Sequence, residues 1–187
     1  AGLMQPGEVY VLNDPYHGGT HLPDVTVVTP VFAAPGSAID DGILFYVASR
    51  GHHADIGGIT PGSMPPDSTD IEEEGVLLDN VSLVSDGTFF ESELLEHLKS
   101  GRYPARNPEQ NLADLKAQVA ANEKGVQELH RMIEHFGFNV VHAYMGHVQN
   151  NAEECVRRVL SKLSSGTFRY EMDDGNNVAV SIRVNAE

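Results

Sequence analysis

The sequence predicts an α+β protein: a β-rich N-terminal half with long loops, a long antiparallel helical hairpin, and a trailing β-strand or hairpin. Three observations predict this class. Short runs rich in β-branched residues, separated by Pro-Gly and Asp-Gly turns, fill residues 1–105. Apolar residues recur at helical spacing over residues 106–166, and strand-like alternation returns at 167–187. We expect these three ranges to form one domain.

Four strand-like runs lie in the first half. Residues 8–13 end at an Asp-Pro step, and residues 25–32 are rich in valine and threonine. Pro30 predicts that this second run is an edge strand or stops pairing there, because proline donates no hydrogen bond. Residues 43–48 are apolar on both faces, which predicts a strand inside a sheet covered on both sides. Residues 76–84 form the fourth run.

Two further segments precede the helical region. Residues 57–70 contain closely spaced glycines and prolines, so they cannot be regular and form either a functional loop or a plain connector. Residues 91–100 carry three leucines on one side and predict a short helix that ends at Gly101.

A long helix is predicted with both of its ends. Asn107 is a suitable N-cap, Pro108 suits the first helical position, and Gln110 can complete a capping box. Gly137 ends the helix after about 29 residues, or ~43 Å. Gly125 in its middle indicates close packing or a local bend. A heptad seam with one polar member runs along it: Leu112, Leu115, Val119, Asn122, Val126, Leu129, Ile133 and Phe136.

Asn139 is predicted to cap a second amphipathic helix that stops at Gly166. The short link between two long helices predicts an antiparallel hairpin, and the seam then packs within the chain or binds a partner. Residues 167–184 predict strands with a turn at Asp174-Gly175.

The net charge of −15 is uneven along the chain. Residues 1–105 contain 16 acidic residues and three basic ones, which disfavours nucleic acid and anionic membranes as partners. No run has the length of a membrane span, and the N-terminus lacks the features of a signal peptide. Cys155 is the only cysteine, so an internal disulfide is excluded. We expect a buried, unreactive thiol and a reducing compartment, the cytoplasm.

Two polar clusters follow strand-like runs. The first contains His21 and Asp24, and the second is Gly-His-His-Ala-Asp-Ile-Gly-Gly from Gly51. Imidazole and carboxylate groups that converge from two strand ends suit a borderline divalent metal such as Zn, Mn or Fe. His52 and His53 point opposite ways on an extended chain, so we expect at most one of them to face the metal.

Other polar residues of these clusters are candidates for binding and catalysis. Asp55 is a candidate ligand, imidazole acceptor or general base. Arg50 suits a substrate carboxylate, with an ordinary salt bridge as the alternative. We expect Tyr16 and Thr20 to line the same substrate site. Five further histidines, expected to be exposed or to cap helices, lie on predicted helices: His97, His130, His135, His142 and His147.

Four motifs of this chain resemble the hydantoinase B/oxoprolinase family. They are Asn-Asp-Pro with Gly-Gly-Thr-His-Leu-Pro-Asp at residues 13–24, and the stretches 45–66, 114–122 and 143–149. The last three are similar in particular to 5-oxoprolinases. The resemblance covers residues 6–184.

The resemblance implies an ATP-dependent opening of a cyclic amide, in which 5-oxoproline, ATP and water give glutamate, ADP and phosphate. A hydantoinase A-type subunit or domain would bind ATP and phosphorylate the carbonyl oxygen, and the B half would act on the activated ring. Carried over to this chain, His21, Asp24 and one of His52 and His53 are the metal ligands. Asp14 and Asp55 lie close by, and with His53 they are the catalytic candidates.

Alternatives remain within the family and outside it. The chain could belong to the B component of an N-methylhydantoinase or of an acetone or acetophenone carboxylase. It could also be a non-catalytic assembly module that docks on the ATP-binding partner through the heptad seam. Family members are several hundred residues long, so the resemblance implies that this chain is an interior part of such a protein and is inactive by itself. The resemblance also implies a hetero- or homo-oligomer.

Overall fold

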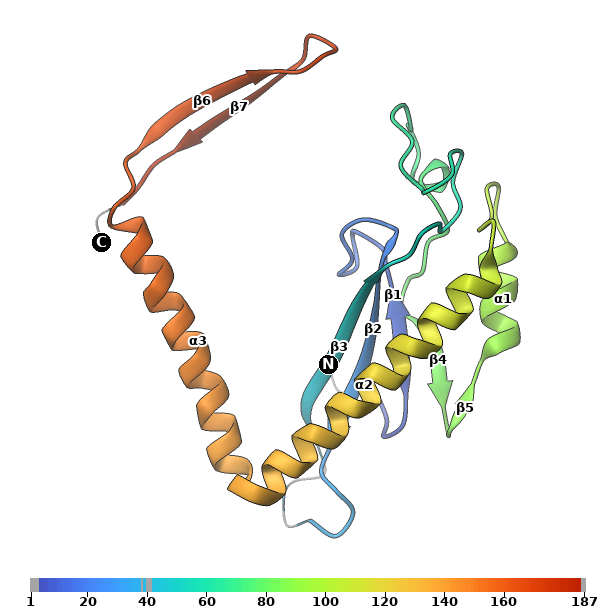
Figure 1. The fold of residues 1–187 in the computed structure, drawn as a ribbon, viewed down its shortest axis with the longest axis vertical. Coiled ribbons are helices and arrows are strands. Elements are labelled where there is room, and N and C mark those ends of the chain that lie inside the picture. The colour runs from blue at the N-terminus through green and yellow to red at the C-terminus, as the bar shows by residue number, and fades with distance from the viewer. Residues whose placement is uncertain (1–3, 38, 40–41, 186–187) are drawn as a thin grey trace. The chain divides into compact units, whose positions relative to one another are not determined.

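The computed structural model describes residues 4–37, 39 and 42–185 (Figure 1). The chain divides into two compact units, Ala1–Met132 and Ile133–Glu187, and the boundary falls within the long helix. The α+β class is confirmed, with a five-stranded antiparallel sheet, long helices and a trailing strand pair. The divisions predicted at residues 105 and 166 stay predictions.

The sheet of the first unit has the strand order β3-β2-β1-β4-β5, and all neighbouring strands are antiparallel. The longest pairing joins β2 and β3, which places the end of β3 beside the start of β2. The strands are β1 (Val9–Leu12), β2 (Asp24–Phe32), β3 (Ile43–His52), β4 (Val81–Ser85) and β5 (Thr88–Phe89).

Three predictions about these strands are wrong. β3 is an edge strand with half-buried and exposed side chains, so its apolar run does not mark a strand covered on both faces. β2 is an interior strand and continues pairing to Phe32. Pro30 is tolerated because β1 pairs with β2 only as far as Val28, which leaves one side of β2 free at the proline. Residues 76–80 precede β4 without joining the sheet.

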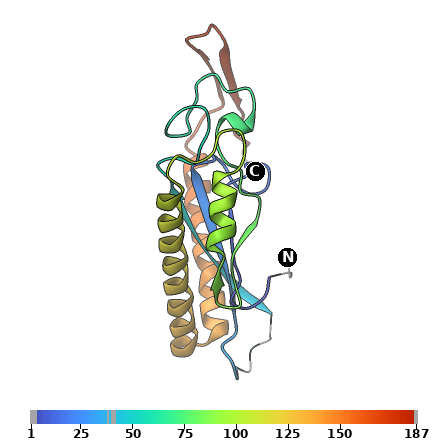
Figure 2. The same cartoon turned by 90° about the vertical axis from the view of Figure 1, so that its right-hand side faces the viewer.

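Two helices cover one face of this sheet, α1 (Glu91–Lys99) and α2 (Pro108–Phe136) (Figure 2). Both bounds of α2 match the prediction. The side-chain amide of Gln110 donates to the carboxylate of Asp114. The core is formed by inward-facing valines and a leucine of the strands and by leucines of the helices, among them Val11, Val25, Val27, Leu83, Leu94, Leu98, Leu112 and Leu115.

The heptad seam is core in its first part and exposed at its end. Leu112 and Leu115 are buried in the core of the first unit, whereas Phe136 is 56% exposed. The first part of the seam is therefore unavailable to a docking partner. Close packing at Gly125 is confirmed, because a Cβ there would lie 2.8 Å from Cγ1 of Val47.

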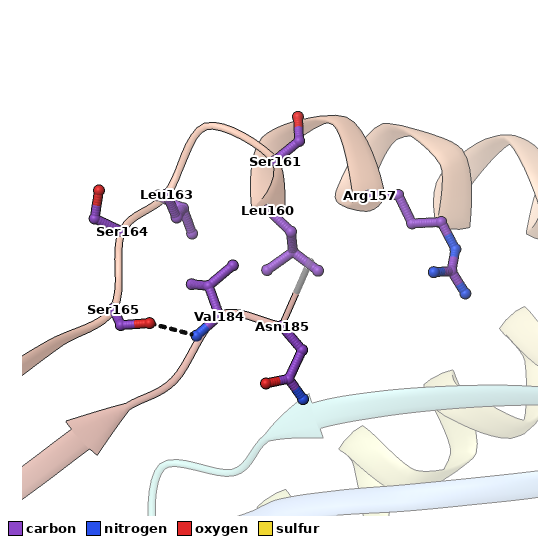
Figure 3. A pocket seen from close by; sticks show the side chains of 8 residues that line it. All are labelled: Arg157, Leu160, Ser161, Leu163, Ser164, Ser165, Val184 and Asn185. Atoms are coloured by element: carbon purple, nitrogen blue, oxygen red, sulfur yellow. Dashed lines mark hydrogen bonds between the residues drawn. The ribbon is translucent and has the colours of Figure 1, made fainter. Parts of the chain in front are cut away.

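The second unit contains α3 (Phe138–Leu160) and the antiparallel pair β6 (Gly166–Glu171) and β7 (Asn177–Ile182). The predicted strand pair is confirmed. Gly137, not Asn139, occupies the N-cap of α3, and the helix ends at Leu160. Cys155 is exposed, so the prediction of a buried thiol is wrong. The end of α3, the segment that leads to β6 and the residues after β7 line a pocket of about 560 Å³ (Figure 3).

The predicted antiparallel packing of α2 and α3 concerns how the two units lie relative to one another, and it stays a prediction. The remaining element is a 3-10 turn, Ile71–Glu73, in the irregular segment that follows β3. No described helix combines the length and the hydropathy that a membrane crossing requires.

Candidate metal centre

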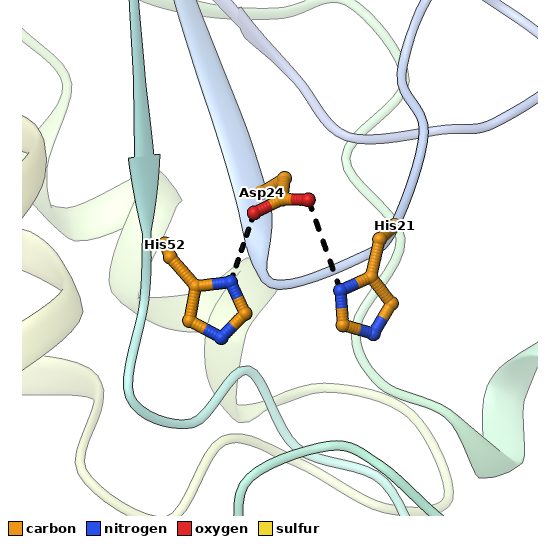
Figure 4. A group of neighbouring side chains, drawn as sticks. All are labelled: His21, Asp24 and His52. Carbon is orange, nitrogen blue, oxygen red and sulfur yellow. Dashed lines mark hydrogen bonds and ion pairs between the residues drawn. The ribbon is translucent and has the colours of Figure 1, made fainter.

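The candidate metal centre lies where β2 begins and β3 ends. Asp24 and His52 are cross-strand partners in the antiparallel register, so their side chains leave the same face of the sheet. Nδ1 of His52 lies 2.8 Å from Oδ1 of Asp24. Nδ1 of His21 lies 3.8 Å from the other carboxylate oxygen, Oδ2 (Figure 4).

A tight turn positions His21 beside this pair. The backbone N–H of Asp24 donates to the carbonyl of His21 at 2.8 Å, so the chain reverses at Pro23. The N–H of His53 donates to the carbonyl of Pro23, also at 2.8 Å, and ties the end of β3 to the turn. The two imidazole rings that face Asp24 have centroids 5.8 Å apart.

The three side chains fit a divalent metal ion. One ligand atom from each lies within 4.8 Å of the others, and the set of two imidazoles and a carboxylate is typical of zinc, manganese or iron. The side chains of His21, Asp24 and His52 are 33%, 31% and 60% exposed, so an ion here would be open to solvent or a substrate. The cluster thus combines metal-ligand chemistry with access.

Arg50 lies on the same face of the sheet, two residues before His52 in β3. Its Nε donates to Oγ1 of Thr26, its cross-strand partner, at 2.8 Å, and its Nη1 donates to Oγ1 of Thr20 at 3.3 Å. Within the described residues Arg50 forms no ion pair, which leaves its positive charge without a protein carboxylate. Tyr16 is 86% exposed.

His53 lies outside the cluster because it faces the opposite side of the sheet. Its side chain is buried against α2, where Asn111 donates to Nδ1 at 2.9 Å and Nε2 is 3.2 Å from Oε1 of Gln118. Gln118 donates through its own Nε2 to strand carbonyls, so the ring N–H is at Nε2 of His53. Burial lowers the pKa of His53, which therefore remains a neutral core residue.

Asp55 is held in a loop and is not among the clustered ligands. Its Oδ1 accepts the N–H groups of Gly57 and Arg106, and its Oδ2 accepts the N–H of Gly62 and Nη1 of Arg106 at 2.7 Å. Burial would raise the pKa of Asp55, but these hydrogen bonds outweigh it and lower the pKa. The structure thus gives this carboxylate a loop-closing role, and its role as a ligand or base stays a prediction.

Asp14 belongs to a second polar group that the sequence did not reveal. His17 Nδ1 lies 2.9 Å from Oδ2 of Asp14 and 3.1 Å from Oδ2 of Asp79, which comes from a distant loop. Asn13 joins the two loops, because its amide donates to the carbonyl of Val76 and accepts the N–H of Leu78. The Asn-Asp-Pro motif was the signal for this junction, but nothing in the sequence pointed to its partner loop.

Two of the helix histidines also differ from expectation. His97 and His130 are partly buried and bind the carbonyl oxygens of Leu77 and Phe32, at 2.8 and 2.9 Å. They join helices to loops and strands and are neither exposed nor helix caps.

Comparison with known proteins identifies relatives of this chain. The family model described as hydantoinase B/oxoprolinase matches residues 1–187. The chain is 45% identical to 5-oxoprolinase of Dictyostelium discoideum over 190 residues, covering 97% of this chain and 14% of that protein. It is 40% identical to 5-oxoprolinase of Saccharomyces cerevisiae, covering 100% and 15%. The chain therefore spans about a sixth or less of the length of these relatives.

A solved structure shares the fold. The ATP-dependent caprolactamase from Pseudomonas jessenii matches with a TM-score of 0.75 and 26% identity, over 97% of this chain and 31% of that one. Similarity to the family model, to named oxoprolinases and to this structure extends over essentially the whole chain. The chain belongs to the hydantoinase B/oxoprolinase family.

Proposed function

We propose that this chain is part of an ATP-dependent cyclic amide hydrolase of the 5-oxoprolinase type, the B half that acts on the activated lactam. The observation that carries the proposal is the cluster of His21, Asp24 and His52 beside Arg50, which forms no ion pair within the described residues. The similarity to 5-oxoprolinases and to a caprolactamase supports a cyclic amide over a ketone as the substrate class.

Arg50 would bind the carboxylate of 5-oxoproline. A guanidinium recognises a carboxylate through two parallel hydrogen bonds, and Thr20 and Thr26 already orient this one. Because Arg50 and His52 leave the same face of β3, a bound carboxylate would bring the small lactam ring next to the imidazoles. Tyr16 remains a proposed lining residue from the same loop.

His21, Asp24 and His52 would hold the divalent ion, and a bound Zn, Mn or Fe polarises a carbonyl or lowers the pKa of water. Asp24 contacts both imidazoles, so it would also orient their rings. Asp14 lies in the neighbouring loop as a further candidate for proton transfer. His53 and Asp55 would act through the fold, by fixing the backbone of β3 and of the loop that follows it.

The ATP would bind to a hydantoinase A-type subunit or domain, since this chain contains no Gly-Lys-Ser/Thr phosphate loop. The partners are then that subunit or domain and a small cyclic amide, in a hetero- or homo-oligomer of the cytoplasm. We expect no hydrolysis of 5-oxoproline by the 187 residues alone.

The test is metal content by elemental analysis, on protein purified without chelator. We expect one Zn, Mn or Fe per chain, and its loss in both His21→Ala and His52→Ala. His147→Ala, which changes a histidine on α3, is the matched control and should keep the metal. If the wild-type protein carries no metal and takes up none of the three ions when they are added, the ligand assignment is overturned.

A further inference from the structure

A second group of metal-ligating side chains lies where two loops meet, outside the candidate metal centre. Asp14 and His17 come from the loop after β1, and Asp79 comes from the loop before β4. Nδ1 of His17 lies 2.9 Å from Oδ2 of Asp14 and 3.1 Å from Oδ2 of Asp79. One donor atom of each residue lies within 4.8 Å of the other two, so all three face the same small volume.

The junction of the two loops is fixed by Asn13, whose side chain is buried. Its amide donates to the carbonyl of Val76 at 2.9 Å, and its side-chain oxygen accepts the N–H of Leu78 at 2.6 Å. The backbone N–H of Asn13 also donates to the carbonyl of Leu78 at 2.9 Å. Asp14 and Asp79 each directly follow one of these bonded residues, so the fold itself sets the two carboxylates close together.

Each carboxylate directs one oxygen at His17 and has its other oxygen engaged. Oδ1 of Asp14 accepts the N–H of Tyr16 at 2.8 Å, and Oδ1 of Asp79 accepts a side-chain N–H of Asn80 at 2.9 Å. Hydrogen bonds of this kind orient carboxylates that ligate metals. The two Oδ2 atoms are left facing the imidazole nitrogen.

The negative charge of this group is not balanced by lysine or arginine. Within the described residues, Asp14 and Asp79 form ion pairs with His17 only. Nδ1 of an imidazole carries at most one hydrogen, so it cannot donate a full hydrogen bond to two carboxylate oxygens at once. Asp14 is only 5% exposed, and a buried carboxylate requires a paired charge or a metal ion. A divalent cation would neutralise both carboxylates and accept the lone pair of Nδ1.

The spacing and the donor types fit manganese. Two neighbouring ligands of an octahedral ion, each bound at about 2.1 Å, lie about 3.0 Å apart, close to both Nδ1 to Oδ2 distances. Carboxylate oxygens suit Mg²⁺ and Mn²⁺, and the imidazole favours the transition metal of the two. The side chains of His17 and Asp79 are 57% and 49% exposed, so water can fill the remaining coordination positions.

We propose that Asp14, His17 and Asp79 form a second metal site, which binds Mn²⁺ and joins the loop after β1 to the loop before β4. Because two of its three ligands are exposed, the ion exchanges with solvent and is lost on purification, and added Mn²⁺ refills the site. The two groups share no ligand, so the second site is testable whether or not the first one binds metal.

The test is Mn²⁺ binding to this chain in a background that removes the first centre, His21→Ala with His52→Ala. Electron paramagnetic resonance counts free Mn²⁺ during a titration, and the nitrogen modulation of the bound ion reports a ligated imidazole. We expect one Mn²⁺ per chain with one imidazole nitrogen. Adding His17→Ala or Asp79→Asn should weaken binding at least about tenfold, since even the loss of an outer-shell partner costs that much. His17→Ala should also remove the nitrogen signal.

The matched control is Asp86→Asn, which removes the same charge from an exposed residue in the turn between β4 and β5. It should bind Mn²⁺ as tightly as the background protein. Circular dichroism should show the same fold in every variant, because His17 and Asp79 are about half exposed.

Three results would overturn the proposal. The first is no Mn²⁺ uptake by the background protein, which would make the group an ion pair of an imidazolium with two carboxylates. The second is equal weakening by Asp79→Asn and Asp86→Asn, which would make binding a general attraction to an acidic surface. The third is a nitrogen signal that survives His17→Ala, which would place the ion on another histidine.

Discussion

At the scale of single residues, two adjacent histidines have opposite environments. His52 points into the candidate metal centre, and His53 points into the core beneath α2. His52 is the last residue of β3 and His53 follows it directly, and successive side chains of an extended chain leave opposite faces. Asn111 and Gln118 then satisfy both ring nitrogens of His53, so this imidazole has no lone pair left for a metal.

We predict that His53→Gln lowers the free energy of unfolding by about 1–3 kcal/mol, because buried partners on α2 lose their hydrogen bonds. Metal content should be unchanged. The converse pattern, a lost metal with little loss of stability, is expected for His52→Gln. Urea unfolding and elemental analysis of the two variants check this, and a metal-free but stable His53→Gln would contradict the assignment.

The lowered pKa of Asp55 predicts that the stability of the fold depends on pH. Its pKa in the folded chain is below the ordinary value of 3.8, so the folded state binds the proton less readily than the unfolded state. The stabilisation by the carboxylate is therefore fully present above that value and is lost as the pH falls through the folded pKa.

We expect Asp55→Asn to cost about 2 kcal/mol near pH 7, through lost charge-assisted hydrogen bonds to Arg106 and the loop amides. The difference between wild type and variant should shrink as the pH is lowered toward about 3. Urea unfolding across this range measures it. A difference that is constant with pH would mean that the ionised carboxylate contributes nothing.

At the scale of elements, amide side chains of α2 hold the edge strand of the sheet. Gln118 donates to the carbonyls of Val25 and Ser49, and Asn122 donates to that of Val27 and to Oγ1 of Thr29. These bonds join the helix to β2 and β3, the two strands from whose ends Asp24 and His52 project. Asn122, the polar member of the heptad seam, thus binds α2 to the sheet.

A substitution at Gly125 tests how closely α2 approaches β3. Alanine should stabilise a helix by about 1 kcal/mol relative to glycine, but here its Cβ would clash with Val47, and overpacking costs about 1–3 kcal/mol. We expect Gly125→Ala to destabilise the wild type and to stabilise a Val47→Ala background. Thermal unfolding of the four proteins of this cycle measures the sign change.

The control for this prediction is Gly146→Ala on α3, where a Cβ would meet no atom within 4 Å. It should raise stability by up to about 1 kcal/mol in either background. Equal effects at the two glycines would mean that α2 does not pack closely on β3.

At the scale of the whole molecule, the buried core lies almost entirely in the first unit. The main core cluster runs from Val9 to Leu115, and the candidate metal centre is within the same range. The second unit is largely exposed, with Val141 its one buried apolar residue among those described.

We therefore expect residues 1–137 to fold without the rest of the chain and to keep the metal centre. The melting temperature should change by no more than about 5 °C, because few buried contacts are lost. Circular dichroism and elemental analysis of this shortened chain check the prediction. Loss of cooperative unfolding would show that the second unit contributes to the core.

Much of the fold could be predicted because its signals are local. Asn107, Pro108 and Gly137 define both ends of α2 through caps and backbone geometry that neighbouring residues determine. The position of β3 in the sheet could not be predicted, because an apolar run has the same composition at an edge and in the interior. Residues 76–80 have strand-like composition but no strand partner, and pairing depends on residues far away in sequence.

The sequence by itself determined the α+β class, the family and the residues that form the candidate metal centre, since these depend on composition, periodicity and motifs. Tertiary structure decided which imidazole faces Asp24, because a pleated strand alternates its faces and only the packing of α2 shows which one is buried. It also assigned Asp55 to a loop with Arg106 and Asp14 to a group with Asp79. The contact of Asp55 with Arg106 spans 51 positions, and the hydrogen bond from Leu78 to Asn13, which joins the loops of Asp14 and Asp79, spans 65. Such long-range pairs leave no local pattern.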